Sequence, residues 1–228
     1  MLNSDTMTKQ DWQRWQFHWN NALAACKSHG GSAEPLATGP PATSKEIEAI
    51  EKEVGSKLPK SLRLIITSYS GEVQVSWQLP DEAQRPETFR EIFSGGISWS
   101  LKRIKEAENE RRGWQKNVFA DPKDEYDAVW HNKLGFMQVP NGDVIAFDLK
   151  GGDDPPVVYL SHEDGECHGY RLGDNFIDFV DRWTRIGCPG PEDWQMSPFL
   201  ASPQSGFGTD STNASEWRKW FGMDAQQD

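Results

Sequence analysis

The segment 43–71 contains two runs of hydrophobic residues at helical spacing. In chain order these residues are Ile47, Ile50, Val54, Leu62, Ile65, Ile66 and Tyr69. Thr43 and Glu46 fit a capping box before the first run. Gly55 can end the first helix in a left-handed conformation, and Leu58-Pro59 then leads into the second helix. The pattern therefore predicts two short helices joined by a Gly-x-x-Leu-Pro corner that ends at Gly71.

A longer amphipathic segment precedes this helix pair. Residues 9–28 carry an apolar stripe at helical spacing, made of Trp12, Trp15, Trp19, Leu23 and Cys26. The Pro-, Gly- and Ala-rich segment 32–41 that follows is typical of a linker. We interpret the stripe as core packing and not as a ligand-binding site. We expect residues 1–42 to form a Trp-rich helical extension and linker.

Alternating hydrophobic and polar residues predict strands after Gly71. Residues 72–78 alternate throughout, and residues 97–101 alternate again beyond a polar loop at 80–95. Ser100 is then a candidate N-cap for a helix that runs toward Trp114.

The clearest succession of strands lies further along the chain. Strands are predicted at 136–139, 144–149, 157–161 and 168–172, and the first turn contains the hairpin dipeptide Asn141-Gly142. Because consecutive strands joined by short turns pair antiparallel, these segments predict a meander. A helix then follows, with Phe176, Phe179, Val180 and Trp183 on one face. The predicted class is α+β, with a mostly antiparallel twisted sheet of about five to six strands wrapped by helices.

The end of the chain has a different composition. Residues 202–215 are rich in Ser, Gly and Thr, which is typical of a flexible linker. Trp217, Trp220 and Phe221 follow, and they are expected in a short helix that docks on the body or on another copy. We therefore predict a domain at 43–187 and a C-terminal aromatic tail at 188–228, with self-association through the Trp-rich extensions.

Charge is distributed unevenly along the 228 residues, whose formal net charge is −11. The region 121–170 contains 11 acidic and three basic residues. An acidic chain is a poor match for nucleic acid, which binds clustered Lys and Arg. Solubility is one reading of this excess. The sharper reading is a surface that steers a basic protein partner.

Targeting signals and cysteine spacing indicate the cellular compartment in which the protein is expected. We find neither the run of about 20 apolar residues that spans a membrane nor a secretory leader pattern. Cys26, Cys167 and Cys188 are widely spaced and offer no pairing framework. The expected location is the cytoplasm, with no membrane association.

The order helix, Gly-x-x-Leu-Pro, helix, strand, meander and helix resembles the SUKH superfamily, and in particular its Smi/Knr-like branch. The resemblance covers about 43–187. It rests on these residues: Ile47, Glu48, Glu51, Gly55, Leu58, Pro59, Leu62, Phe136, Gly142, Ile145, Ala146, Phe147, Asp148, Val158, Tyr159, Phe176, Ile177, Asp178 and Phe179.

The resemblance implies a non-catalytic binding module. Many bacterial members look like immunity proteins of toxin–antitoxin type, which block a toxin domain that is often a nuclease or a deaminase. The family has no shared catalytic residue or cofactor. It implies only structural roles for Gly55, Leu58 and Pro59. The expected partner is a protein toxin domain, which we predict to be basic.

Acidic residues in predicted loops are the candidates for partner binding, because binding residues gather on loops held by a rigid scaffold. They are Asp124, Glu125, Asp127, Asp153, Asp154, Glu163 and Asp164. For each of them, the alternative is an ordinary solvated turn residue.

Other chemistry is weakly supported. His162, His168 and Cys167 match no zinc spacing, and the acids at 121–127 lack the glycine and terminal glutamate of an EF-hand. No nucleophile elbow or phosphate-binding loop occurs. We expect no catalytic residue, metal or cofactor. Three classes stay open: a toxin inhibitor, a regulatory or structural interaction module with a non-toxin partner, and an enzyme of unknown type.

Overall fold

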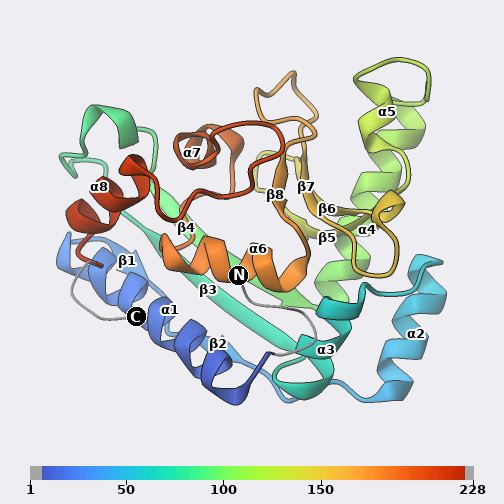
Figure 1. Cartoon of the computed structure of the whole chain (residues 1–228), viewed down its shortest axis with the longest axis horizontal. Coiled ribbons are helices and arrows are strands. Elements are labelled where there is room, and N and C mark those ends of the chain that lie inside the picture. The colour runs from blue at the N-terminus through green and yellow to red at the C-terminus, as the bar shows by residue number, and fades with distance from the viewer. Residues whose placement is uncertain (1–6, 224–228) are drawn as a thin grey trace.

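The computed structural model describes residues 7–223, which form an α+β fold with two antiparallel sheets (Figure 1). The first sheet contains β1 (Ser32–Ala33), β2 (Ala37–Thr38), β3 (Glu72–Gln78) and β4 (Ser94–Ser100). The second contains β5 (Lys133–Gln138), β6 (Val144–Asp148), β7 (Val157–Leu160) and β8 (Arg171–Gly173). The helices of the described residues are α1 (Lys9–Ser28), α2 (Ser44–Val54), α3 (Lys60–Ser68), α4 (Leu101–Asn117), α5 (Asp127–Trp130), α6 (Phe176–Arg185), α7 (Asp193–Met196) and α8 (Thr212–Phe221).

The predicted helix pair is confirmed. Thr43 caps α2 and forms the capping box with Glu46, and Gly55 ends the helix with φ 66°. Leu58 is buried, and its backbone N–H donates to Glu51 Oε1 at 3.0 Å. The corner is therefore fixed by a buried carboxylate as well as by its glycine and proline.

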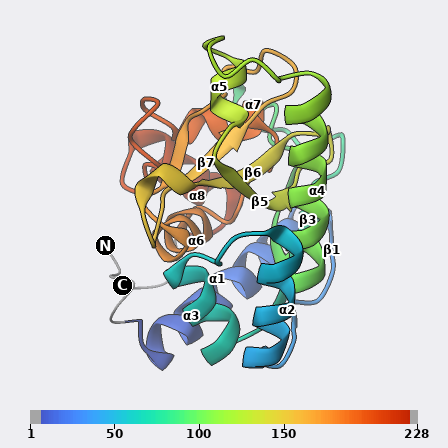
Figure 2. The same ribbon diagram turned by 90° about the vertical axis from the view of Figure 1, so that its right-hand side faces the viewer.

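Strand pairing is antiparallel, as predicted, but the strands form two sheets and not one. In the first sheet β3 pairs with β4 on one side and with β1 and β2 on the other. The segment 32–41, expected as a linker, thus supplies two short edge strands, because the free edge of β3 offers backbone partners to it. The second sheet has the order β5-β6-β7-β8 and lies beside α4 (Figure 2).

The tryptophan stripe of α1 is core, as expected. Trp15 and Trp19 are fully buried against α6. Their indole N–H groups donate to Asp181 Oδ1 at 2.9 Å and to Thr184 Oγ1 at 2.8 Å. Both indoles are thus buried with their N–H groups paired.

The C-terminal aromatics pack on the same chain. Trp217 is fully buried, and its indole N–H donates to the carbonyl of Ile186 at 2.8 Å. Phe207 is buried and stacks on Trp183 with ring centres 5.9 Å apart. Trp217 and Phe221 are therefore buried within the chain, whereas Trp220 is half-buried, and self-association through the extensions stays a prediction.

Three observations complete the fold. The last meander strand begins at Arg171 and not at residue 168, because 167–170 form a turn. Within residues 7–223, no helix is long and apolar enough to cross a bilayer. The division into 1–42, 43–187 and 188–228 stays a prediction, and its ends at 1–6 and 224–228 lie outside the described residues.

Candidate functional site

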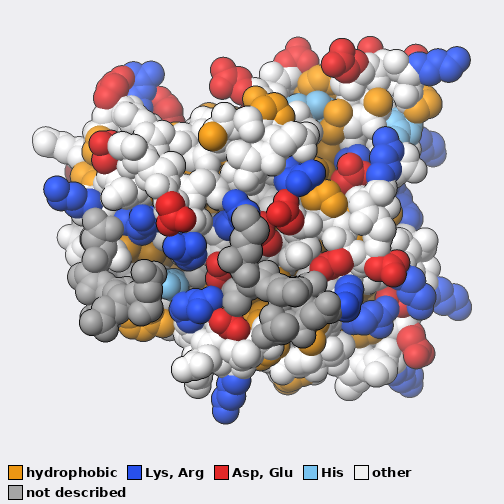
Figure 3. Space-filling model, in the orientation of Figure 1, with side chains coloured by type: hydrophobic (Ala, Val, Ile, Leu, Met, Phe, Trp, Pro, Cys, Tyr) orange, Lys and Arg blue, Asp and Glu red, His pale blue; other side chains and the backbone are white. Residues whose placement is uncertain are grey.

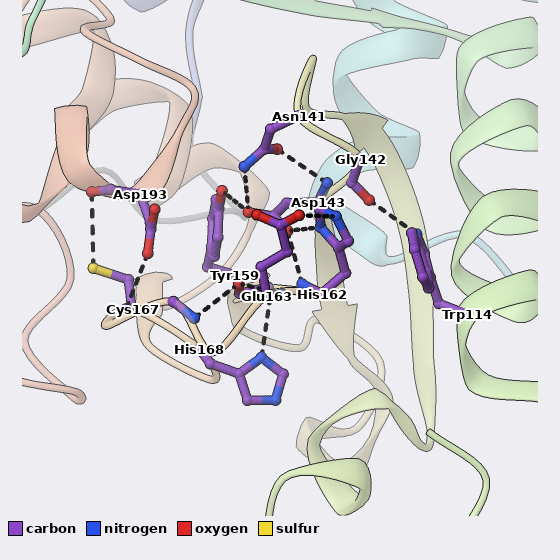
Figure 4. A network of polar contacts seen from close by, with 12 residues as sticks. Trp114, Asn141, Gly142, Asp143, Tyr159, His162, Glu163, Cys167, His168 and Asp193 are labelled. Carbon is purple, nitrogen blue, oxygen red and sulfur yellow. Dashed lines mark hydrogen bonds and ion pairs between the residues drawn. The ribbon is translucent and has the colours of Figure 1, made fainter. Parts of the chain in front are cut away.

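One end of the second sheet is built around a buried carboxylate, Asp143 (Figure 4). Asp143 follows the Asn141-Gly142 turn between β5 and β6. Its Oδ2 accepts hydrogen bonds from Tyr159 Oη at 2.6 Å and from Asn141 Nδ2 at 2.8 Å. Its Oδ1 accepts from the backbone N–H of His162 at 2.8 Å and lies 2.6 Å from His162 Nδ1. This carboxylate therefore ties the β5–β6 turn to the segment that follows β7.

The His162 ring is held on three sides. Its Nε2 lies 3.4 Å from Glu163 Oε1, opposite the contact with Asp143. Trp114 of α4 packs on it with ring centres 4.6 Å apart, and the Trp114 indole donates to the Gly142 carbonyl at 2.9 Å. The start of the loop 161–167 is thus fixed to both α4 and the β5–β6 turn.

A second set of contacts joins this loop to the start of α5. Tyr126 Oη donates to the Ser161 carbonyl at 2.7 Å. His168 stacks on Tyr126 with ring centres 3.8 Å apart and an interplanar angle of 12°. The acidic segments 121–127 and 161–167 therefore lie side by side.

An acidic pocket of about 240 Å³ opens between the loop 161–167 and α7. Among the residues that the structure describes, its lining contains five carboxylates and no lysine or arginine. The side chains most relevant here are Asp143, Glu163, Asp164, Glu166, Asp193 and Trp194.

Two neighbouring residues of α7 give this pocket its character. Asp193 is 6% exposed, and burial raises the pKa of its carboxyl, with the charges of Asp143 and Glu166 adding to the effect. Trp194 beside it is 44% exposed, which is high for an indole. A carboxylate destabilised by burial, next to an exposed aromatic ring, suits a cationic side chain brought by a partner.

The predicted residues Asp124, Glu125 and Asp127 lie at this end of the molecule. Asp124 and Glu125 are exposed, and Asp127 is half-buried. Asp124 Oδ1 accepts the backbone N–H groups of Tyr126 and Asp127, so it also shapes its own turn. In Figure 3 the acidic side chains gather along the upper edge, over α5 and the nearby loops.

Glu163 and Asp164 lie on the pocket rim, and both are exposed. Asp164 adopts φ 46°, a left-handed conformation that aspartate tolerates better than most residues. The structure therefore brings five of the seven predicted residues to one surface. We call it the acidic end, and it comprises Asp124, Glu125, Asp127, Glu163 and Asp164 together with the pocket and Trp194.

Asp153 and Asp154 lie at the opposite end of the β6–β7 pair. Asp154 Oδ1 accepts the backbone N–H of Ser61 at 2.9 Å and the Ser61 hydroxyl at 2.5 Å, while the Asp153 carbonyl accepts the Lys60 N–H at 2.9 Å. Unpaired N–H groups at a helix start need such acceptors. Asp154 thus has a structural partner, the first turn of α3.

The geometry of the described residues supports neither a metal site nor a reactive cysteine. Within residues 7–223, no group of three or more His, Cys, Asp and Glu side chains is arranged to hold a metal ion. The Cys167 thiol lies 3.9 Å from the Asp193 carbonyl, whereas the adjacent His168 ring packs on Tyr126. Burial raises the pKa of the Cys167 thiol to about 12, which disfavours the nucleophilic thiolate.

Sequence reasoning missed Asp143, Asp193 and Trp194. Asp143 follows an Asn-Gly dipeptide and looks like a solvated turn residue, while Asp193 and Trp194 sit in a four-residue helix with no readable period. A tryptophan that directly follows two acidic residues in a Pro-containing segment was the available signal.

Comparison with known proteins gives one family match. The model of the SMI1/KNR4 family (SUKH-1) matches residues 41–182, well over half of the chain. No curated protein and no solved structure was found to match. The matched region contains Asp143 and the loop 161–167, whereas α7 lies beyond it. The acidic end therefore combines the family core with a segment outside the match.

Proposed function

Because this chain belongs to the SMI1/KNR4 (SUKH-1) family, we propose that it is a non-catalytic immunity protein that neutralises a cognate toxin domain through its acidic end. The family is of toxin-immunity and protein-binding type. We choose this surface because the acidic segments 121–127 and 161–167 lie together beside a pocket that Trp194 borders.

Electrostatics supports a basic partner. Toxin domains that act on nucleic acid, such as nucleases and deaminases, present basic grooves to phosphate. A carboxylate-rich surface accelerates encounter with such a groove and favours the correct orientation. A guanidinium or ammonium group in the pocket would also offset the desolvation that raises the pKa of Asp193.

Trp194 supports a stable complex once encounter has occurred. Binding energy in protein interfaces concentrates in a few aromatic and arginine side chains that become fully desolvated. An indole that is 44% exposed in the free chain can lose that exposure in a complex. The charged rim would then set the rate and the specificity, while the indole would slow dissociation.

The proposal places the protein in the bacterial cytoplasm, where the toxin would act. Cys26, Cys167 and Cys188 are all buried and unpaired, which suits a reducing compartment.

Co-expression with the product of the adjacent gene tests this function. We expect the two proteins to co-purify, the complex to weaken as salt rises, and the chain to rescue growth from the toxicity of its partner. Co-purification without rescue would favour the alternative, a regulatory or structural interaction module with a non-toxin partner. If the chain neither binds such a candidate nor rescues growth from its toxicity, the proposal is contradicted.

A further inference from the structure

A closed set of polar contacts joins the start of α5 to the loop 161–167. His168 Nδ1 accepts the backbone N–H of Ser161 at 3.0 Å. Nδ1 therefore carries no hydrogen, and the ring hydrogen lies on Nε2, which donates to the Tyr126 carbonyl 3.1 Å away. Tyr126 Oη donates in return to the Ser161 carbonyl. We call this arrangement of Tyr126, Ser161 and His168 the clasp.

The clasp accepts only the neutral imidazole. A second ring hydrogen would sit on Nδ1 and face the Ser161 N–H, so that two donors would oppose each other. The stacked phenol at 3.8 Å leaves the ring little freedom to turn away while the clasp stays closed. Protonation and closure thus exclude each other.

We propose that protonation of His168 opens the clasp and separates the acidic segments 121–127 and 161–167, so that the acidic end is ordered at neutral pH and loosened in acid. The opening is a property of this chain alone. Its effect on partner binding rests on the proposed function.

The charges around His168 come from four elements. Asp143 from the β5–β6 turn and Asp164 from the loop favour the protonated ring, as does the Tyr126 carbonyl before α5. Burial and Lys133 of β5 oppose it, and burial is the largest influence, so the pKa of His168 is lowered from its ordinary value. An unfolded or open chain, with a pKa of about 6.5, then binds the proton more readily than the closed one. The stabilisation by the clasp is fully present above that pH and is lost as pH falls through the folded-state pKa.

His162 explains why the loop would open on one side only. Both of its ring nitrogens face carboxylate oxygens, those of Asp143 and Glu163. A ring with hydrogens on both nitrogens can donate to both carboxylates, so acid does not remove these contacts. The loop 161–167 therefore stays anchored to Asp143 while it separates from Tyr126.

Nuclear magnetic resonance of the full chain, without a partner, tests the clasp. At pH 7.5 we expect His168 to be neutral with its hydrogen on Nε2, and the Ser161 amide to be protected from exchange. Between pH 6.5 and the folded-state pKa, the protection of Ser161, corrected for intrinsic exchange, should fall about tenfold per pH unit. Signals of 121–127 should shift with the same midpoint as the His168 ring.

Variants distinguish the clasp from general acid effects. His168→Gln should remove the pH dependence of Ser161 protection, because the amide side chain does not gain a proton over this range. His18→Gln is the matched control, since burial also lowers the pKa of His18 on the distant α1, and it should leave the Ser161 profile unchanged. Tyr126→Phe keeps the stack and loses the contact to the Ser161 carbonyl, so it should raise exchange at pH 7.5 while the His168 titration persists.

Two results would overturn the proposal: a His168 ring with hydrogen on Nδ1 at pH 7.5, or Ser161 protection that does not change across the His168 titration. If the loop opens in acid but no toxin domain binds at any pH, the proposed function fails and the clasp stands. If binding weakens in acid while Ser161 protection stays constant, the clasp is wrong and the proposed function survives.

Discussion

Acidic loops lie at both ends of the β6–β7 pair. One loop contributes a carboxylate to the scaffold, whereas the other leaves its carboxylates exposed. At one end, Asp154 is occupied by the N–H and hydroxyl groups of Ser61 at the start of α3. At the other end, Glu163 and Asp164 border an open pocket. The buried Asp143 also lines this pocket, and its carboxylate holds the loop through hydrogen bonds. An aspartate becomes part of the scaffold where unpaired donors meet it, and it stays available to a partner where none do.

The largest expected effect comes from the buried carboxylate of the acidic end. Asp143→Ala should lower the free energy of unfolding by about 3 kcal/mol, because it leaves buried donors of Tyr159 and His162 without an acceptor. Asp143→Asn should cost nearly as much, because an amide N–H₂ then faces donors. Urea unfolding measures both. Glu125→Ala, at an exposed position, is the control and should change stability by less than about 0.5 kcal/mol. A loss below 1 kcal/mol for both Asp143 variants would show that the loop does not depend on this carboxylate.

The exposed indole should matter for binding and little for stability. Trp194→Ala should weaken toxin binding by about 2 kcal/mol, roughly 30-fold, because truncated aromatic anchors cost that much. Phe17→Ala is the matched control, since Phe17 is 40% exposed on α1, away from the acidic end. Calorimetric titration gives both affinities. Equal losses for the two variants would remove Trp194 from the interface.

Charge reversal on the pocket rim should slow association. The double variant Glu163→Lys with Asp164→Lys should lower the association rate constant about tenfold at low salt, and the difference should shrink as salt rises. The control is the single reversal Asp153→Lys at the other end of the sheet. Stopped-flow mixing at two salt concentrations checks this. An unchanged rate for the double variant would exclude steering by this loop.

The smallest expected effect lies at the structural end. Asp154→Ala should lower the free energy of unfolding by about 1 kcal/mol, as loss of a helix cap does, with no change in toxin affinity. Asp153→Ala should be near neutral, because Asp153 contacts α3 through its backbone carbonyl. A larger effect on affinity than on stability for Asp154 would reverse the roles assigned to the two loops.

Regular periodicity allowed most of the fold to be predicted. The α2–α3 corner, the α1 stripe and the meander all follow from apolar spacing and capping residues that act locally. β1 and β2 did not follow, because strands of two residues have no period, and they exist only where β3 offers a free edge.

The site was only partly predictable. Loop position pointed to acidic residues such as Asp124 and Glu163, which are exposed, but it did not indicate which of them share one surface. It gave no indication that Asp143 is buried, because that burial depends on contacts with Tyr159 and His162, which lie 16 and 19 residues further along the chain. For the same reason the sequence did not distinguish Asp154 from Glu163. Only the contact of Asp154 with Ser61 at the start of α3 gives it a structural role.

The most direct test of the account is a map of the toxin-bound surface by nuclear magnetic resonance, using the indole N–H signals of the 11 tryptophans and the backbone amides. We predict that the Trp194 indole and the amides of 121–127 and 161–167 shift on binding. The buried indoles of Trp15 and Trp77, and the amides around Asp154, should stay in place. Shifts centred on Asp154 and α3, with Trp194 unchanged, would contradict the assignment of function to the acidic end.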